Sequence, residues 1–272
     1  MLKFDPQDEL ICLRAGEAIE EHHGAVLPPI AQASLFRQPT MEKLHESLSR
    51  EYEDAVYSRG TNPTVRVLEE TLAKLERGEA CKCFASGMGA VSAVLTGLLK
   101  AGDHILFVND IYGPTIELAE RLGDFGIDFS QTYSTKVEEI SEQLRDKTRL
   151  IFMESPGSTL FGLLPISEIA TLARSRDILT ILDNSVSTPL LQKPIPMGVD
   201  LVVHSCSKYI GGHSDVIGGA VIGSGELIER IFYKSYMLLG SVLSPFDAWL
   251  LLRGLLTLPT RMQRHHSDTH IV

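Results

Sequence analysis

From Thr64 onward the chain alternates short apolar runs with amphipathic stretches, and this alternation restricts its fold more than any other feature. Seven runs have the character of strands: KCFAS, HILFVN, DFSQTY, RLIFMES, ILTILD, DLVVHS and GGAVIG. The stretches of helical spacing include residues 64–78, 89–100, 115–123, 137–145 and 167–174. Strands that alternate with helices predict βαβ units in a mostly parallel sheet. We therefore expect an α/β fold with a doubly wound sheet of about seven strands.

The charge composition argues against some classes of binding partner. The chain has 272 residues, and its 35 acidic against 25 basic side chains give a formal charge of −10. This balance argues against a nucleic-acid surface and against docking on an anionic membrane. The start of the chain lacks the apolar core of a signal peptide. The four cysteines, Cys12, Cys81, Cys83 and Cys206, are too few for a disulfide scaffold, so we expect reduced thiols in a cytoplasmic protein.

The two ends of the chain have other patterns. Residues 1–60 show no clear period, which predicts an extended N-terminal arm with one helix around residues 41–53. Ser244 and Pro245 suit the cap and the first position of a helix. We expect some of the apolar residues of that last segment to form an exposed patch: Trp249, Leu250, Leu251, Leu255, Leu256 and Leu258.

Glycines follow the first apolar run, at a point where parallel sheets bind ligands. Gly87 and Gly89 offer bare backbone amides to an anion at a helix N-terminus. With Ser92 and with Asp110 as a ribose-binding acid, they could form a dinucleotide site. They could also hold a single phosphate group, or form a tight turn that only packs a helix on the sheet.

A lysine and a carboxylate follow two other runs. Lys208 comes just after Ser205 and Ser207, and could form a Schiff base with an aldehyde cofactor whose phosphate the two hydroxyls hold. Most lysines, however, simply lie on polar loops. Asp183 ends a strongly apolar run, where a carboxylate is costly unless it meets a cation or hydrogen-bond donors. A protonated pyridine nitrogen would be such a partner, and a helix N-cap is the alternative.

Two further strand ends carry polar side chains. Tyr112 could stack on a planar ring or transfer protons, or be an ordinary turn aromatic. Glu154 ends the run RLIFMES, with helix capping as its alternative role. These parts together form a phosphate site, a Schiff-base lysine, a carboxylate and a stacking aromatic. This is the set that pyridoxal 5′-phosphate needs, whereas a dinucleotide accounts only for the glycines.

Histidines near the two ends of the chain raise the question of a metal. The set comprises His22, His23, His265, His266 and His270, of which the last two have an i, i+4 spacing that could grip a metal on a helix. No third ligand accompanies them in the sequence, so we interpret them as solvated and predict no metal site.

The motifs resemble those of the Cys/Met-metabolism pyridoxal-phosphate enzymes, which include cystathionine β-lyase, cystathionine γ-synthase, cystathionine γ-lyase and methionine γ-lyase. The motifs are YSRGTNPT, ASGMGAV, NDIYGPT, ESPGS, LDNS, SCSKYIGGHSD and SPFDAWLLLRGLLTL. The resemblance implies a fold-type-I, aspartate-aminotransferase-like large domain over residues 61–243, preceded by an arm over residues 1–60. Residues 244–272 would begin the link to a C-terminal domain that the sequence does not include.

The resemblance also implies roles. Lys208 resembles the Schiff-base lysine, Asp183 the acid on the pyridine nitrogen and Tyr112 the stacking tyrosine. The other positions implied to hold the cofactor are Gly87, Met88, Ser205, Ser207, Glu154 and Ser158. Tyr57 and Arg59 match residues that reach the phosphate of a neighbouring subunit, which implies a homodimer or homotetramer.

The local motifs imply a reaction. ESPGS around Ser158 and YGPT around Pro114 are similar to those of bacterial cystathionine β-lyases. The implied activity is β-elimination of cystathionine, an amino-acid substrate, to homocysteine, pyruvate and ammonia. γ-Replacement and γ-elimination remain alternatives. So does a cofactor-binding remnant without turnover, because no arginine here matches the one that binds the substrate carboxylate in the family.

Overall fold

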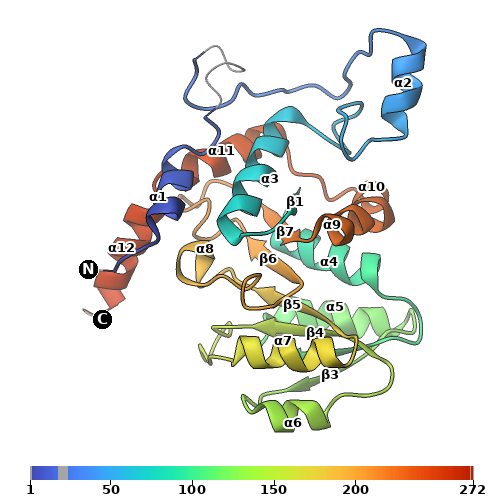
Figure 1. The fold of residues 1–272 in the computed structure, drawn as a ribbon, viewed down its shortest axis with the longest axis vertical. Coiled ribbons are helices and arrows are strands. Elements are labelled where there is room, and N and C mark those ends of the chain that lie inside the picture. The colour runs from blue at the N-terminus through green and yellow to red at the C-terminus, as the bar shows by residue number, and fades with distance from the viewer. Residues whose placement is uncertain (1, 18–23, 270, 272) are drawn as a thin grey trace.

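A computed structural model describes residues 2–17, 24–269 and 271, so that His22, His23 and His270 lie outside the described residues. Within them, seven strands form one sheet (Figure 1). The strands are β1 (Ala80–Phe84), β2 (His104–Val108), β3 (Asp128–Thr132), β4 (Thr148–Glu154), β5 (Leu179–Asp183), β6 (Leu201–Ser205) and β7 (Gly219–Gly223). Each coincides with one of the seven apolar runs, which confirms the prediction of a seven-stranded sheet.

The sheet has the order β1-β7-β6-β5-β4-β2-β3. The pairs from β6 to β3 are parallel, whereas β7 is antiparallel to both β6 and β1. All five residues of β2 and of β7 are buried. Strands that are buried in this way form apolar runs because both faces of the sheet are covered. The predicted mostly parallel α/β fold is therefore confirmed.

Helices lie on both faces of this sheet (Figure 1). They are α3 (Pro63–Glu76), α4 (Gly87–Leu98), α5 (Gly113–Gly123), α6 (Val137–Glu142), α7 (Ile166–Ser175), α8 (Thr188–Leu191) and α9 (Gly225–Ile231), followed by a π-helix η1 (Phe232–Tyr236) and α10 (Met237–Leu239). Residues of α4, α5 and α9 share one core cluster with Ile181 and Leu201, which pair across the sheet. Leu182 and Val202, the next pair, belong to clusters on the opposite face with α7 and α3.

The N-terminal segment contains a helix that the sequence did not predict. Helix α1 (Pro6–Leu13) is capped by Asp5, so the expectation of an extended chain there is wrong. Its buried Asp8 lies 2.8 Å from Arg77 Nη1 and 2.7 Å from Lys193 Nζ. Ion pairs therefore help to hold α1 in place. Its sequence lacks the apolar stripe by which amphipathic helices are recognised, so the helix was not predicted.

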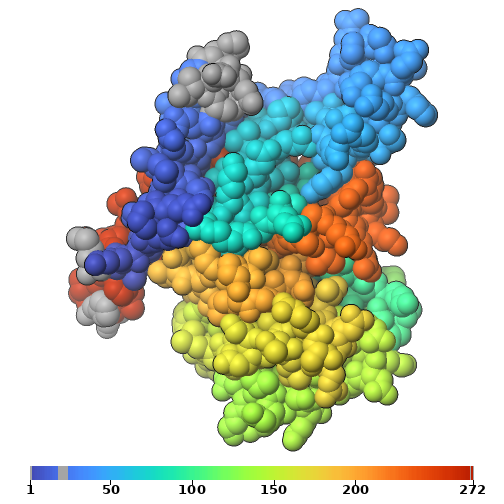
Figure 2. Space-filling view, in the orientation of Figure 1, coloured from blue at the N-terminus to red at the C-terminus, as the bar shows by residue number. Residues whose placement is uncertain are grey.

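Helix α2 (Met41–Leu48) forms where the arm helix was predicted, although it ends five residues earlier, and Thr40 caps it. In the space-filling view the segment around α2 projects from the body of the molecule (Figure 2). A β-bridge between Leu35 and Tyr57 joins the two sides of this arm. Backbone hydrogen bonds from Phe36 N to Val56 O and from Ser58 N to Ser34 O lie beside it.

The last two helices pack on the sheet domain. α11 (Pro245–Leu255) has the predicted cap, with Asp247 N donating to Ser244 Oγ over 3.0 Å, and α12 (Leu258–Thr269) follows it. Leu251, Leu255 and Leu258 are fully buried in the cluster that contains α3. The prediction of an exposed patch is therefore wrong for these three residues. Nowhere in the described ranges is a helix both long and apolar enough to cross a membrane.

Candidate active site

The turn between β1 and α4 forms an anion cup. Ser86 caps α4: its Oγ accepts from Gly89 N at 2.9 Å and its carbonyl from Ala90 N at 3.1 Å. The first four amides of a helix have no partner within the helix, so those of Gly87 and Met88 remain available to an anion.

The end of β6 lies against this cup. A Cβ placed on Gly87 would be 3.1 Å from Ser205 Cβ and 3.2 Å from Ser205 Oγ, so the serine hydroxyl is next to the start of α4. The structure thus brings Gly87, Met88 and Ser205 together as the sequence predicted. Ser207 is nearby in the chain, but its hydroxyl already accepts from Gly218 N at 3.1 Å and so also holds the loop that precedes β7.

Two residues of the cup escaped sequence reasoning. Ser241 O accepts from Ala85 N at 3.1 Å, and a side chain on Gly89 would overlap Ser241 Oγ. A side chain on Gly219 would likewise overlap the Ser86 carbonyl. Gly219 could have been found from the sequence, because it stands at the start of an apolar run. The serine gives no such signal because its neighbours come from a segment far earlier in the chain.

The dinucleotide alternative is excluded by the strand order. β7, β6, β5 and β4 lie between β1 and β2, so these two strands are not the neighbouring parallel pair that a dinucleotide-binding βαβ unit requires. Asp110 Oδ2 instead accepts from the amides of Thr159 and Leu160, at 2.5 and 2.8 Å. It shapes the loop after β4, and a ribose-binding role for it is wrong.

Two carboxylates lie side by side at the ends of β4 and β5, where Glu154 and Asp183 are register partners. Asp183 Oδ1 accepts from Ser185 N at 2.9 Å, and Ser185 Oγ accepts from Ser205 N at 2.7 Å. Burial raises the pKa of Asp183 despite the hydrogen bonds from Ser185. Among the described residues no basic side chain forms an ion pair with it, so this carboxylate would be stabilised by a cationic group of a ligand.

Glu154 supports the backbone of Tyr112. Its Oε2 accepts from Tyr112 N at 2.9 Å and its Oε1 from Ser158 Oγ at 2.5 Å, with only 4% of the residue exposed. Burial and the neighbouring Asp183 raise its pKa to about 7. Tyr112 itself is 49% exposed, which leaves room for a planar ligand against its ring. Glu154 therefore binds both Ser158 and the tyrosine backbone, contacts that the sequence did not predict.

A second layer lies behind these residues. Glu76 Oε1, fully buried on α3, accepts from Asn184 Nδ2 at 2.8 Å and lies 2.6 Å from His204 Nε2. Asn184 follows Asp183 in the chain and His204 precedes Ser205. Glu76 thereby ties together the ends of β5 and β6, although the sequence shows it only as one more charged residue of a helix.

Lys208 lies on the turn that follows β6. Its amide donates to Ser205 O at 3.1 Å, and its carbonyl accepts from Gly212 N at 2.8 Å. The residue is exposed, and in the described part of the chain no carboxylate forms an ion pair with it. An amine that no salt bridge occupies is suited to react with an aldehyde.

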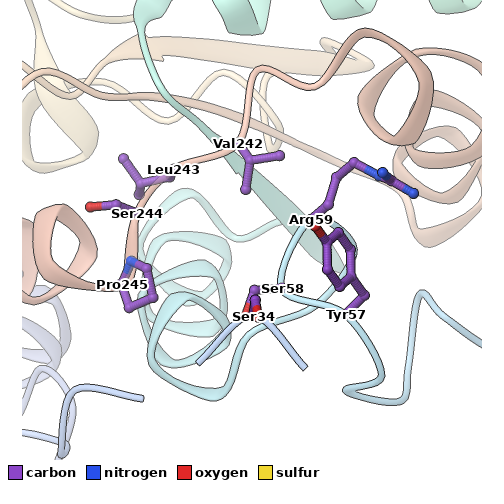
Figure 3. A pocket seen from close by; sticks show the side chains of 8 residues that line it. All are labelled: Ser34, Tyr57, Ser58, Arg59, Val242, Leu243, Ser244 and Pro245. Carbon is purple, nitrogen blue, oxygen red and sulfur yellow. The ribbon is translucent and has the colours of Figure 1, made fainter. Parts of the chain in front are cut away.

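Tyr57 and Arg59 lie on the N-terminal arm before α3, not at the end of a strand. The Arg59 guanidinium carbon is 5.1 Å from the centroid of the Tyr57 ring. Both line a cavity of about 230 Å³ with Ser34, Ser58 and the segment Val242, Leu243, Ser244 and Pro245 (Figure 3). Figure 3 shows the Arg59 side chain extending away from Ser244 and Pro245. No hydrogen bond or ion pair of the described residues joins this pair to Lys208, Asp183 or the glycine cup.

The histidines within the described ranges belong to no cluster of metal ligands. Over residues 2–17, 24–269 and 271, no group of three or more His, Cys, Asp or Glu side chains is arranged to hold a metal ion. The His265 ring instead makes an edge contact with Tyr209, with ring centroids 5.2 Å apart.

The strand-end residues fit pyridoxal 5′-phosphate. The cup of Gly87, Met88 and Ser205 has donors for its phosphate, and Asp183 is a withdrawn carboxylate for its ring nitrogen. Lys208 has a free amine for its aldehyde, and Tyr112 an open ring face.

Comparison with known proteins gives matches along nearly the whole chain. The profile of the Cys/Met metabolism PLP-dependent enzymes matches residues 9–272. L-methionine gamma-lyase of Pseudomonas putida is 38% identical over 271 residues, which is 99% of this chain and 65% of that protein. Cystathionine beta-lyase of Lactococcus lactis subsp. cremoris is 38% identical over 258 residues, 94% of this chain and 65% of that protein.

A solved structure of similar fold supports the sequence matches. A putative O-acetylhomoserine (thiol)-lyase from Campylobacter jejuni, solved with N′-pyridoxyl-lysine-5′-monophosphate, superposes with a TM-score of 0.89 and 29% identity. The match covers 95% of this chain and 72% of that one. The present chain thus spans slightly less than two thirds of the length of the two relatives above.

Proposed function

Because the chain belongs to the Cys/Met metabolism PLP-dependent enzyme family, we propose that it is the cofactor-binding part of a C–S lyase that acts on a sulfur amino acid. One observation carries the proposal. Gly87, Ser205 and Asp183 come from three strand ends of one sheet: Gly87 lies against Ser205, and Ser185 links Asp183 to Ser205. Lys208 lies on the turn that follows Ser205.

Each of these residues has a defined task. Bound pyridoxal 5′-phosphate supplies an electron sink for the charge that develops at the substrate Cα. Asp183 holds the proton on the ring nitrogen, and the Gly87–Ser205 cup fixes the phosphate. Lys208 Nζ would take the Cα proton of the bound substrate. Tyr112 or Lys208 then donates a proton to the sulfur that leaves from Cβ.

We favour β-elimination of cystathionine to homocysteine, pyruvate and ammonia. The support is local: Pro114 lies in the first turn of α5, directly after the tyrosine segment, and Ser158 holds Glu154 beneath it. Overall similarity does not separate the reactions, since a β-lyase and a γ-lyase are both 38% identical to this chain. γ-Elimination, γ-replacement and cofactor binding without turnover are the alternatives.

We also propose that the protein is a cytoplasmic homodimer or homotetramer, with residues 1–60 as an arm, residues 61–243 as the cofactor domain and residues 244–272 as the start of a link to a further domain. Within the described part of one chain, no hydrogen bond or ion pair joins Tyr57 or Arg59 to the strand-end residues. A pair that serves a neighbouring subunit would have this property.

The test of cofactor binding is direct. The wild-type protein, reduced with borohydride in the presence of pyridoxal 5′-phosphate, should carry the label on the peptide that contains Lys208. Lys208→Ala should lose the label, and Lys234→Ala, an exposed lysine of η1, should keep it. A label on any other lysine contradicts the assignment.

The test of the reaction is the product. Cystathionine should give pyruvate and homocysteine. Formation of 2-oxobutyrate and cysteine would show γ-elimination, efficient use of an acylated homoserine would show γ-replacement, and cofactor uptake with no product would show the remnant.

A further inference from the structure

Arg261, which lies outside the sheet domain, donates hydrogen bonds to the turn that carries Lys208. Arg261 lies on α12, and its Nη1 donates to Tyr209 O at 2.6 Å while its Nη2 donates to Gly254 O at 2.8 Å. A longer bond of 3.5 Å runs from Nη2 to Ile210 O, and Nε donates to Thr257 Oγ1 at 3.0 Å. Tyr209 and Ile210 are the two residues that follow the lysine.

The guanidinium is committed to the backbone. In the described part of the chain no carboxylate forms an ion pair with Arg261, and burial lowers its pKa. Its four hydrogen bonds use four of the five N–H donors of an arginine. The fork that could otherwise bind a substrate carboxylate is therefore occupied by main-chain carbonyls.

Glycines allow this close packing. Gly212 has φ +72°, and a side chain there would overlap the Arg261 guanidinium. A side chain on Gly254, in α11, would overlap the carbonyls of Ile210 and Gly211. The backbone of the turn is thus enclosed by α11 on one side and by the arginine on the other.

We propose that Arg261 is a positioning residue for Lys208: by holding the Tyr209 and Ile210 carbonyls, it sets where the lysine amine lies relative to Asp183 and Ser205. The inference rests on the proposed function, because it assigns the lysine to the cofactor. Charge-assisted hydrogen bonds from a planar fork fix direction as well as distance, which a hydrophobic contact does not do.

The test compares Arg261→Met and Arg261→Lys with Arg264→Met, a control on the same helix whose exposed side chain pairs with Asp268. Two readouts are needed. The first is amide hydrogen exchange at Gly211 and Gly212 in the protein without cofactor, since these amides donate to Cys206 O and Lys208 O within the turn. The second is the pH midpoint of the visible absorption of the protein loaded with pyridoxal 5′-phosphate, which reports the surroundings of the lysine nitrogen.

In Arg261→Met we expect exchange to be about ten-fold faster and the midpoint to move by about one pH unit, with Arg261→Lys between this variant and the wild type. Arg264→Met should match the wild type in both. Unchanged exchange overturns the inference, and so does faster exchange with an unmoved midpoint, which would mean that the arginine only stabilises the fold.

If Arg261→Met does not fold, wild-type values in Arg261→Lys overturn the inference. A wild-type protein that shows no visible band overturns the proposed function, and the positioning role with it. The exchange data then report separately whether Arg261 stabilises the turn.

Discussion

The carboxylate side of the candidate site and its arm side are built in opposite ways. Glu154 and Asp183 end adjacent strands, are register partners, and receive hydrogen bonds from Tyr112 N, Ser158 and Ser185. Tyr57 and Arg59 sit on the arm, outside the sheet, where Tyr57 forms a β-bridge with Leu35. The Arg59 guanidinium carbon lies 5.1 Å from the centroid of the Tyr57 ring. A sheet places side chains at its own edge, whereas an arm needs something to lie against before its side chains have fixed positions.

The difference predicts how each region responds to change. Substitutions on the carboxylate side should act within a single chain and at any protein concentration. Substitutions in the arm should act only where chains associate. Four measurements test whether the two regions differ in this way.

Asp183→Asn should have the largest effect. The amide cannot hold a proton on a pyridine nitrogen, so a charge-assisted hydrogen bond is lost, and we expect the Kd for pyridoxal 5′-phosphate to rise about 100-fold. Fluorescence titration measures it. Asp177→Asn, at an exposed left-handed turn before β5, is the control and should bind as the wild type does. An Asp183→Asn protein with wild-type Kd would remove the carboxylate side from the site.

Glu154 should make the protein without cofactor less stable as the pH rises. Its pKa moves from an ordinary value of 4.5 to about 7 on folding, because of burial and of repulsion by Asp183. Between these values the folded state binds more protons than the unfolded state, so the contribution of Glu154 is fully present below pH 4.5 and is lost as the pH rises through about 7. The free energy of unfolding should fall by about 2 kcal/mol over this range.

Urea unfolding between pH 5 and pH 7.5 tests this. Glu154→Gln should flatten the pH dependence, although the amide cannot accept both existing hydrogen bonds and therefore lowers stability by a constant amount at all pH values. Glu168→Gln, an exposed carboxylate of α7, should keep the wild-type slope. An unchanged slope in Glu154→Gln would mean that another group titrates.

Arg59→Ala tests the arm. If its guanidinium reaches a phosphate in a neighbouring subunit, the Kd should rise about ten-fold at concentrations where chains associate, and should not change where they are separate. Cofactor titration beside sedimentation at two protein concentrations measures both. Arg37→Ala, an exposed arginine of the same arm, is the control. A ten-fold loss in separated chains would place Arg59 at the site of its own chain.

Tyr57→Ala should have the smallest effect. The ring lies 5.1 Å below the Arg59 guanidinium carbon and is 39% exposed, and such a contact contributes about 0.5–1 kcal/mol. We expect a loss of affinity of about three-fold, again only in associated chains. Tyr133→Ala, at the far edge of the sheet, should match the wild type. An effect larger than that of Arg59→Ala would mean that the ring itself contacts the cofactor.

The same contrast explains what could be predicted from the sequence. Strand ends follow apolar runs, so the positions of Asp183, Glu154 and Ser205 along one edge were evident before the structure. Contacts of the second layer were not. Glu76 meets Asn184 and His204 across more than a hundred residues, and nothing local to the helix marks it.

Two further features show the same limit. Helix α1 escaped prediction because its buried face includes Asp8, which pairs with Arg77 and Lys193. Arg261 escaped because its partners are main-chain carbonyls, which every residue has and no sequence pattern marks. Periodicity detects apolar burial, whereas polar burial depends on partners that only the completed fold brings together.

The position of β1 at the sheet edge has a consequence for biosynthesis. In the described sheet β1 has β7 as its neighbour, and the pairing of Ala80 with Gly223 joins segments about 140 residues apart. A ribosome completes β1 first of all the strands, yet must add the other six before β1 can dock. Gly219, against the Ser86 carbonyl, arrives with that last strand. A nascent chain therefore has no finished anion cup before β7 emerges, and until then its first strand can pair with other strands or bind chaperones.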